Sequence, residues 1–479
     1  MTTPLIPRRR LIPHRRLIPV LAVAAVVGSF GLAPPAVATP PSPGVHAPHL
    51  DNPYAGATAY VDPEWRANAE RQPEGRAVSA TPTALWIDEV AKIGGKAGSM
   101  GLRAHLDAAL AQKATLVQVV LDDLPGPRCL MLNPAGDFAV GEIERYRKEF
   151  IDPIAAIESD PRYGSLRIVN VLEPQAVAGL IVGVHQYYGI GDCLEQQASG
   201  DHVAGLRHAL NALRPYSNLY TYVDMAHRGI LGWPENFTHA ADLLVSVVKG
   251  TTAGLASLDG ITTDVAGYSA LTEPFFTSKT TVGGRQVLES KWIDWNPYAD
   301  ELSFAQALRT KLVSLGFAPG LGVVIDTSRN GWGGPARPTK ASTSTDVNQF
   351  VDQSRVDRRF AADDWCNQAG AGLGEPPRTT PSTGIDAYAW IKAPGVSDGA
   401  STWADGVDTP GLEPMCDPRY SGTRSSPRKP GALPNAPAKG TWFPEHFRQL
   451  LANTYTPLPP GTGPTSTGPT PDEPTRGPR

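Results

Sequence analysis

Short apolar runs recur along the chain, and longer amphipathic segments separate them. The runs carry little polar alternation, which is typical of parallel strands buried on both faces. The predicted strands are 84–87, 116–121, 166–172, 219–223, 258–263, 321–325 and 387–391. Two of the separating segments, 140–157 and 303–315, place apolar residues three or four positions apart and therefore predict helices.

Alternation of strands with helices predicts an α/β fold with a parallel sheet and right-handed crossovers. About seven strands favour a barrel over an open sheet, although the pattern alone leaves closure open. Polar residues follow most of the strands, and in such folds the carboxyl ends of the strands line the site. They are Asp122, Asp123, Glu173, Asp224, His227, Asp326, Arg329, Lys392 and Asp398. Each could instead be a cap or a loop anchor, but their recurrence at one end of the strands favours a shared cleft.

The two ends of the chain differ in composition from its centre. Residues 1–38 combine a basic stretch, an apolar run and the triplet Ala36-Val37-Ala38, which predicts a secretory signal peptide cleaved after Ala38. A membrane anchor is the alternative, and the prolines before the triplet argue against it. We expect a Pro-rich disordered segment at 39–51, a globular unit at 52–456 and a Pro/Thr/Gly-rich tail or linker at 457–479. The mature protein should therefore be secreted and extracellular, with no membrane span.

The charge and the cysteines of the chain bear on three features: nucleic-acid binding, metal sites and disulfides. The net charge is −4 with acidic and basic residues mixed, so a nucleic-acid partner is not expected. Four cysteines are present, none in a CxxC pair, and we expect no metal site and no cofactor. Export favours disulfides, and of the three possible pairings we prefer the sequential one, Cys129–Cys193 with Cys366–Cys416. Ten tryptophans supply candidate platforms for sugar rings.

Several motifs, taken in order, resemble one family. They are Asn52-Pro53-Tyr54, Leu85–Asp88, Asp123–Gly126, Gly232-Trp233, Ser290–Asn296, Asp326–Pro335, Asp364–Gly374, Lys392–Gly399 and Gly431–Pro437. The chain is similar to the bacterial exocellulases of glycoside hydrolase family 6. That resemblance implies a distorted, partly open α/β barrel with an enclosed cleft and inverting hydrolysis of β-1,4-glucan. It also supports the two cysteine pairs, and we expect a monomer whose partners are β-1,4-glucan and cello-oligosaccharides.

The position of the family's general acid is changed in this chain. Inverting hydrolysis needs a protonated carboxyl on the leaving oxygen and a route for removing a proton from water on the opposite face. The family's acid follows a strand as Glu-Pro-Asp or Glu-Ile-Asp, and here the motif is Glu173-Pro174-Gln175. An amide can donate a hydrogen bond but no proton, and loss of a general acid typically costs about 10²–10⁴ in rate.

Four further positions depart from the family pattern. Arg128 replaces the carboxylate before the first cysteine, and a cation there would lower the pKa of a neighbouring carboxyl. Asp122 replaces a tyrosine, Pro134 replaces a water-holding serine, and Ile230 replaces a tryptophan platform. Asp122 is also an alternative acid, because it is new beside the site. Asp123 and Glu173 occur in active relatives, where neither is the acid.

The resemblance also identifies retained residues. Trp86, Asp88, Trp365 and Lys392 match residues that hold sugar on the non-reducing side, and His227 and Trp233 match leaving-side contacts. Asp398 matches the carboxylate usually assigned as the base, although the glutamate two residues before it is Val396 here. The alternative for each tryptophan is core packing, and for Asp398 it is a structural salt bridge with Lys392 or Arg329.

These observations predict a secreted glucan hydrolase of the inverting family 6 type, with catalysis impaired or rerouted. The first alternative is a non-catalytic glucan-binding protein on the same scaffold. A second is a cell-surface interaction protein that uses the tail.

Overall fold

The computed structural model describes residues 49–96, 98–127, 129, 136–183, 191–401, 414–421 and 429–456. All of them belong to the unit Pro43–Arg479, and the other unit, Met1–Ser42, lies outside them. The predicted signal peptide, most of the Pro-rich segment and the 457–479 tail therefore also lie outside the described residues. His49 is hydrogen-bonded to Ser217 O and Asp259 Oδ1. It lies within the segment 39–51 that was expected to precede the globular unit.

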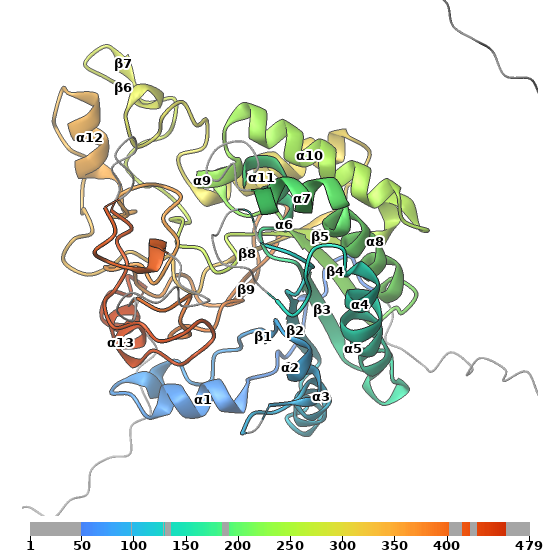
Figure 1. Cartoon of the computed structure of the whole chain (residues 1–479). Coiled ribbons are helices and arrows are strands. Elements are labelled where there is room, and N and C mark those ends of the chain that lie inside the picture. The colour runs from blue at the N-terminus through green and yellow to red at the C-terminus, as the bar shows by residue number, and fades with distance from the viewer. Residues whose placement is uncertain are drawn as a thin grey trace, which may run out of the picture. The chain divides into compact units, whose positions relative to one another are not determined.

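One eight-stranded sheet forms the centre of the fold, in the order β1-β2-β3-β4-β5-β8-β10-β9 (Figure 1). Every pairing in this sheet is parallel except that of β9 with β10. The strands are β1 (Leu85–Ile87), β2 (Leu116–Leu121), β3 (Arg167–Leu172), β4 (Leu219–Asp224), β5 (Gly260–Thr263), β8 (Gly322–Asp326), β9 (Arg378–Ser382) and β10 (Ile385–Ala389). All seven predicted strands are confirmed within a few residues; β9 was not predicted, nor was the small hairpin β6 (Thr281–Val282) and β7 (Arg285–Gln286).

The sheet curls into a barrel that is only partly closed. The first strand and β10 approach each other through an isolated bridge between Thr83 and Trp390. Ala84 N donates to Trp390 O at 3.2 Å, and the Trp86 indole N–H donates to Ile391 O at 3.0 Å. A single bridge in place of a continuous ladder explains the distorted, partly open α/β barrel that the resemblance implied.

Alternate residues of the strands face two different cores. On β2, Leu116 and Val120 belong to the cluster inside the barrel, whereas Val117, Val119 and Leu121 belong to the larger cluster under the helices. This division follows from the period of two in a strand. Both faces are apolar, which explains why the strands appear in the sequence as continuous apolar runs.

Most of the helices cover the outer face of the sheet, while the helices at 63–70, 347–354 and 444–452 contribute to other apolar clusters (Figure 1). The longer ones are α1 (Pro63–Glu70), α3 (Leu102–Ala111), α7 (Gly191–Ser199), α8 (Asp201–Leu213), α10 (Pro234–Lys249), α11 (Glu301–Ser314), α12 (Val347–Ser354) and α13 (Pro444–Ala452). The shorter ones are α2 (Val90–Gly94), α4 (Ile143–Arg145), α5 (Asp152–Glu158), α6 (Ala176–Ala178) and α9 (Arg228–Leu231). The predicted helix 303–315 is α11, and the predicted helix 140–157 is α4 and α5 joined by π-helical residues Tyr146–Ile151. Among the described helices, none combines the length and apolar character that a membrane crossing requires.

Candidate active site

The predicted polar residues gather at the carboxyl edge of the sheet. Because β1 to β5, β8 and β10 run parallel, their carboxyl ends open on the same side of the barrel. Asp88 follows β1, Asp122 follows β2 and Gln175 follows β3. His227 follows β4, and Lys392 follows β10. The strand register therefore brings to one edge residues that are hundreds of positions apart in the chain.

Asp398 is held as a carboxylate by three side chains. Arg329 Nη1 lies 2.9 and 3.0 Å from its two oxygens, and the Tyr268 hydroxyl donates to Oδ2 at 2.9 Å. Burial alone would raise the pKa of Asp398, but Arg329 and then Lys392 hold it below its usual value. Arg329 also lies over the Tyr268 ring, 4.2 Å from its centre. The expected base is thus ionised, and the salt bridge that was its alternative role is present as well.

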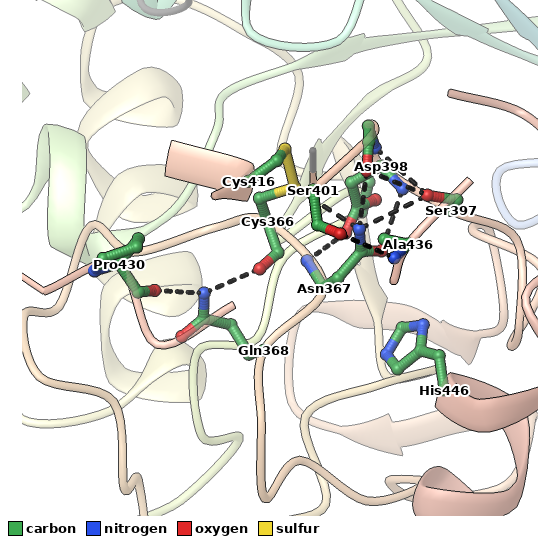
Figure 2. Close-up of a disulfide and its surroundings, with 12 residues drawn as sticks. Cys366, Asn367, Gln368, Ser397, Asp398, Ser401, Cys416, Pro430, Ala436 and His446 are labelled. Carbon is green, nitrogen blue, oxygen red and sulfur yellow. Dashed lines mark hydrogen bonds between the residues drawn. A yellow bond between two sulfur atoms is a disulfide. The ribbon is translucent and has the colours of Figure 1, made fainter. Parts of the chain in front are cut away.

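The neighbours of a disulfide fix the loop that carries Asp398 (Figure 2). Asn367 N donates to Asp398 Oδ2 at 2.8 Å, and Asp398 N donates back to Asn367 Oδ1 at 3.0 Å. Asn367 directly follows Cys366, which is bonded to Cys416 as predicted. The other predicted pair cannot be compared, because the side chain of Cys193 lies outside the described residues.

Lys392 and Trp86 are in contact where the ends of β10 and β1 approach each other. The Lys392 ammonium lies 4.2 Å from the centre of the Trp86 ring, and Lys392 is 4% exposed. Burial lowers the pKa of Lys392 to about 7, against the opposing effect of Asp398. Trp86 is half-buried, so part of its ring is available to a ligand. Trp365 is also half-buried and immediately precedes Cys366.

The side chain of Lys439, which was not among the predicted site residues, lies near both Asp88 and Asp122. Lys439 Nζ lies 3.9 Å from Asp88 Oδ2 and 3.8 Å from Asp122 Oδ2. Asp88 also binds Lys92, and burial, which raises the pKa of Asp88, is outweighed by Lys92 and Lys439, which lower it. Asp122 is 1% exposed. One ammonium thus lies near both carboxyl groups, and Asp122 stays a predicted alternative acid.

Gln175 occupies a left-handed turn at the end of β3. Its φ is 66°, and Glu173 two residues earlier is also left-handed, with φ 49°. Asp224 Oδ2 accepts the Gln175 N–H at 2.8 Å and the Ala226 N–H at 3.0 Å, which holds the turn. Burial raises the pKa of Asp224 to about 7. Gln175 lines a small pocket with Leu124, Cys129, Glu173, Pro174, Ala176, Gly179 and His202.

Asp123 and Glu173 tie two strand-end turns together. The backbone N–H groups of Asp123 and Leu124 donate to Glu173 at 3.3 and 3.2 Å, and Tyr146 OH donates to Glu173 at 2.7 Å. Burial raises the pKa of Asp123 to about 8, and its Oδ1 accepts the Asp137 N–H at 2.8 Å. These contacts give both carboxyls a structural role.

His227 and Trp233 lie where β4 leads into α9 and α10. His227 is 3% exposed, its Nδ1 accepts the Gly229 N–H at 3.1 Å, and burial lowers its pKa well below the usual value. Trp233 is half-buried and donates its indole N–H to Asp294 O at 2.8 Å. His227 can therefore present only a small part of its ring to a ligand, while Trp233 can present more.

Two groups of side chains have spacing that could suit a metal. One is Asp62, Glu64 and His105, and the other is His227, Asp264 and Glu301. In the second, burial and then Glu301 raise the pKa of Asp264 well above its usual value, so the acids hold a proton where a cation would bind. In the first, Asp62 accepts the Glu64 N–H at the start of α1. Oxygen atoms in each group are thus occupied by a hydrogen bond or by a proton. We assign a metal to neither group.

Comparison with known proteins agrees with the fold. The family model described as "Glycosyl hydrolases family 6" matches residues 46–454. The chain is 40% identical to "Exoglucanase A" of Cellulomonas fimi over 85% of its own length, but spans only 49% of that relative. It is 28% identical to "Probable 1,4-beta-D-glucan cellobiohydrolase C" of Aspergillus niger, covering 86% of this chain and 80% of the relative.

Solved structures give the same result. The catalytic domain of Cellulomonas fimi Cel6B is similar with a TM-score of 0.82 and 40% identity, over 88% of this chain and all of that domain (100%). The CcCel6A catalytic domain complexed with p-nitrophenyl beta-D-cellotrioside is similar with a TM-score of 0.65 and 28% identity, over 85% of this chain and 99% of that domain.

Proposed function

The chain belongs to glycosyl hydrolase family 6, and from this premise we propose that it takes β-1,4-glucan into the cleft at the carboxyl edge of the sheet, with hydrolysis impaired. The observation that carries the proposal is the pairing of an ionised Asp398 with an amide at Gln175. The retained half of the mechanism is the removal of a proton from water. The missing half is proton donation to the leaving oxygen.

Glucan as the ligand is supported by the aromatic and cationic groups of the cleft. Trp86 and Lys392 lie against each other, and each can contact sugar: the ring by its face, the ammonium by hydroxyl groups. A solved relative is titled as a complex with a cellotrioside. We propose the same class of ligand here, bound by Trp86, Asp88, Trp365 and Lys392 on one side and by His227 and Trp233 on the other.

A non-catalytic glucan-binding protein is the second candidate, favoured by the amide at Gln175. An amide cannot give a proton to the leaving oxygen, so the two candidates differ in whether another carboxyl does so. If no other group supplies the proton, the cleft binds glucan without cleaving it.

Secretion is part of the proposal. The N-terminal 38 residues have the pattern of a signal peptide. The Cys366–Cys416 disulfide suits an oxidising compartment, where such bonds persist. We propose that the mature protein acts outside the cell as a monomer.

Reducing-sugar release from amorphous cellulose, combined with calorimetry using cellotriose, tests the function. We expect cellotriose to bind, and release to be about 10²–10⁴-fold below that of an intact relative measured in parallel. Binding without any release identifies the glucan-binding alternative. Absence of binding by the wild type contradicts both candidates. Asp398→Asn is the control, because residual release that depends on Asp398 comes from this cleft.

A further inference from the structure

Trp295 is an exposed tryptophan outside the set that sequence motifs identified. Its exposed fraction is 63%, and it is the only tryptophan among the exposed large apolar side chains of the described residues. Burial of an indole ring is favourable, so this ring keeps apolar surface that a ligand would cover with a gain in free energy.

The loop that carries Trp295 is held in a strained backbone conformation. Asp294 and Trp295 both have left-handed φ values, 47° and 64°, which are uncommon for residues other than glycine. Local hydrogen bonds stabilise this conformation: Asp294 N donates to Ser290 O at 2.7 Å, and Trp295 N donates to Leu288 O at 2.8 Å. Such strain persists only where surrounding contacts determine it, and it often accompanies a functional role.

Contacts on either side of Trp295 make the loop a rigid support. The Trp292 ring lies under the Arg355 guanidinium, 3.9 Å from ring centre to carbon. Asn296 is 1% exposed and donates its side-chain amide to Arg228 O at 2.8 Å. The loop is therefore attached to the start of α9, and Trp295 is exposed together with Lys291 and Asp294.

One hydrogen bond links this loop to Trp233, which stands on the proposed leaving side of the cleft. The Trp233 indole N–H donates to Asp294 O at 2.8 Å, so the residue next to Trp295 contacts a tryptophan that follows β4. The β4 end is three strands from β1, which carries Trp86. The loop of Trp295 is thus attached to Trp233, three strands along the sheet from β1.

We propose that Trp295 is an outer platform on which a long β-1,4-glucan chain stacks after it has passed Trp233. The inference rests on the proposed function, because it requires glucan in the cleft. The ligand class follows from the chemistry: a flat exposed ring suits the C–H face of a pyranose, and the neighbouring exposed Asp294 carboxylate accepts hydroxyl groups. A short oligosaccharide that occupies the cleft beside Trp86 does not reach this ring, whereas a polymer does.

Affinity electrophoresis in hydroxyethyl cellulose, with cellotriose calorimetry in parallel, tests the platform. Trp295→Ala should weaken hydroxyethyl cellulose binding about five-fold and leave cellotriose binding unchanged. Trp295→Tyr should retain most of the polymer affinity, because it keeps an aromatic face. Lys291→Ala, an exposed position of the same loop, should behave as the wild type.

Two results would contradict the proposal that glucan stacks on Trp295. One is unchanged polymer binding by Trp295→Ala while the wild type binds both ligands, which leaves the proposed function intact. The other is equal weakening by Lys291→Ala, which would indicate disturbance of the loop in place of stacking. If the wild type binds neither ligand, the proposed function itself fails. Thermal unfolding of each variant confirms that the loop change has not unfolded the protein.

Discussion

Asn367 and Asp398 hold each other through two reciprocal hydrogen bonds, each from the backbone N–H of one residue to the side chain of the other. This pair joins the expected base to a residue adjacent to the Cys366–Cys416 disulfide (Figure 2). Asp398 is therefore held against a residue next to a covalent bond that joins two positions with a sequence separation of 50.

Removing that disulfide should destabilise the protein. The bond closes a loop with a sequence separation of 50, for which the chain-entropy model gives about 4 kcal/mol. We expect Cys366→Ser with Cys416→Ser to lower the free energy of unfolding by roughly this amount in urea denaturation. A loss below about 1 kcal/mol would show that the disulfide contributes little to the loop.

Gly399 should not tolerate a side chain. A Cβ at this position would lie 2.8 Å from Cys416 Sγ, closer than packed atoms allow, and the disulfide leaves the sulfur little freedom to move. We expect Gly399→Ala to cost about 1–3 kcal/mol in urea denaturation, because overpacking forces the backbone to shift. Gly94→Ala is the matched control, since a Cβ there meets nothing within 4 Å. Equal stability of the two variants would contradict the close packing.

Glu158 should make stability depend on pH. It is 0% exposed, and burial raises its pKa to about 8 although Asn170 donates to it at 2.8 Å. The folded protein thus binds a proton more tightly than the unfolded chain, so this contribution to stability is full below about pH 4.5 and is lost as pH rises through about 8.

The variant Glu158→Gln should remove that loss. Urea denaturation at pH 5, 7 and 9 should show the variant gaining stability relative to wild type as pH rises, by about 1.4 kcal/mol for each unit of pKa shift. Parallel profiles for the two proteins would mean that Glu158 does not titrate as described.

Lys392 should make glucan binding sensitive to pH near neutrality. Its pKa of about 7 means that the ammonium is lost as pH rises through this value, and charged donors bind hydroxyl oxygens more strongly than neutral ones. We expect cellotriose affinity to fall about three-fold between pH 6 and pH 8, with Lys392→Met weaker at pH 6 and flat across the range. A wild-type affinity independent of pH would exclude this role.

The second disulfide remains a prediction of the sequence. Peptide mapping without reduction should recover a Cys129–Cys193 linked peptide. A free thiol at either position, or a crossed pair with Cys366 or Cys416, would undermine the alignment on which Arg128 and Gln175 were identified.

The strands were predictable because both of their faces are buried. Val117 and Val120 lie in different cores, so each run appears in the sequence as continuously apolar. The strand β9 was missed because it is largely exposed and its sequence, Arg378–Ser382, is polar with a proline. The ordered His49 was missed because its partners, Ser217 and Asp259, are distant in the chain.

The candidate site residues that belong to a sequence motif could be predicted. The contacts that form only when separate loops come together could not. Trp86 lies on β1 and Lys392 follows β10, and their contact follows from the approach of these two strands at the Thr83–Trp390 bridge. Lys439 has no comparable signal: it lies in a Pro/Ala/Gly loop, and only the folded chain places it beside Asp122. The hydrogen bond from Asn367 N to Asp398 also depends on loop geometry, because its donor is a backbone N–H, which almost every residue carries.

The central claim is that Gln175 stands in the place of the general acid, and restoring a proton donor there tests it most directly. Gln175→Asp alone should gain little, because the resemblance places Arg128, which lies outside the described residues, beside the new carboxyl, where a cation would favour the ionised form. With Arg128→Asp added, two neighbouring carboxyls resist ionising together, which raises one pKa towards a useful range. Reducing-sugar release from amorphous cellulose should therefore be higher for the double variant than for either single variant or the wild type, with a new acidic limb in its pH profile. A wild type that cleaves at the rate of an intact relative, with Asp398 essential and Gln175→Ala harmless, would contradict the account.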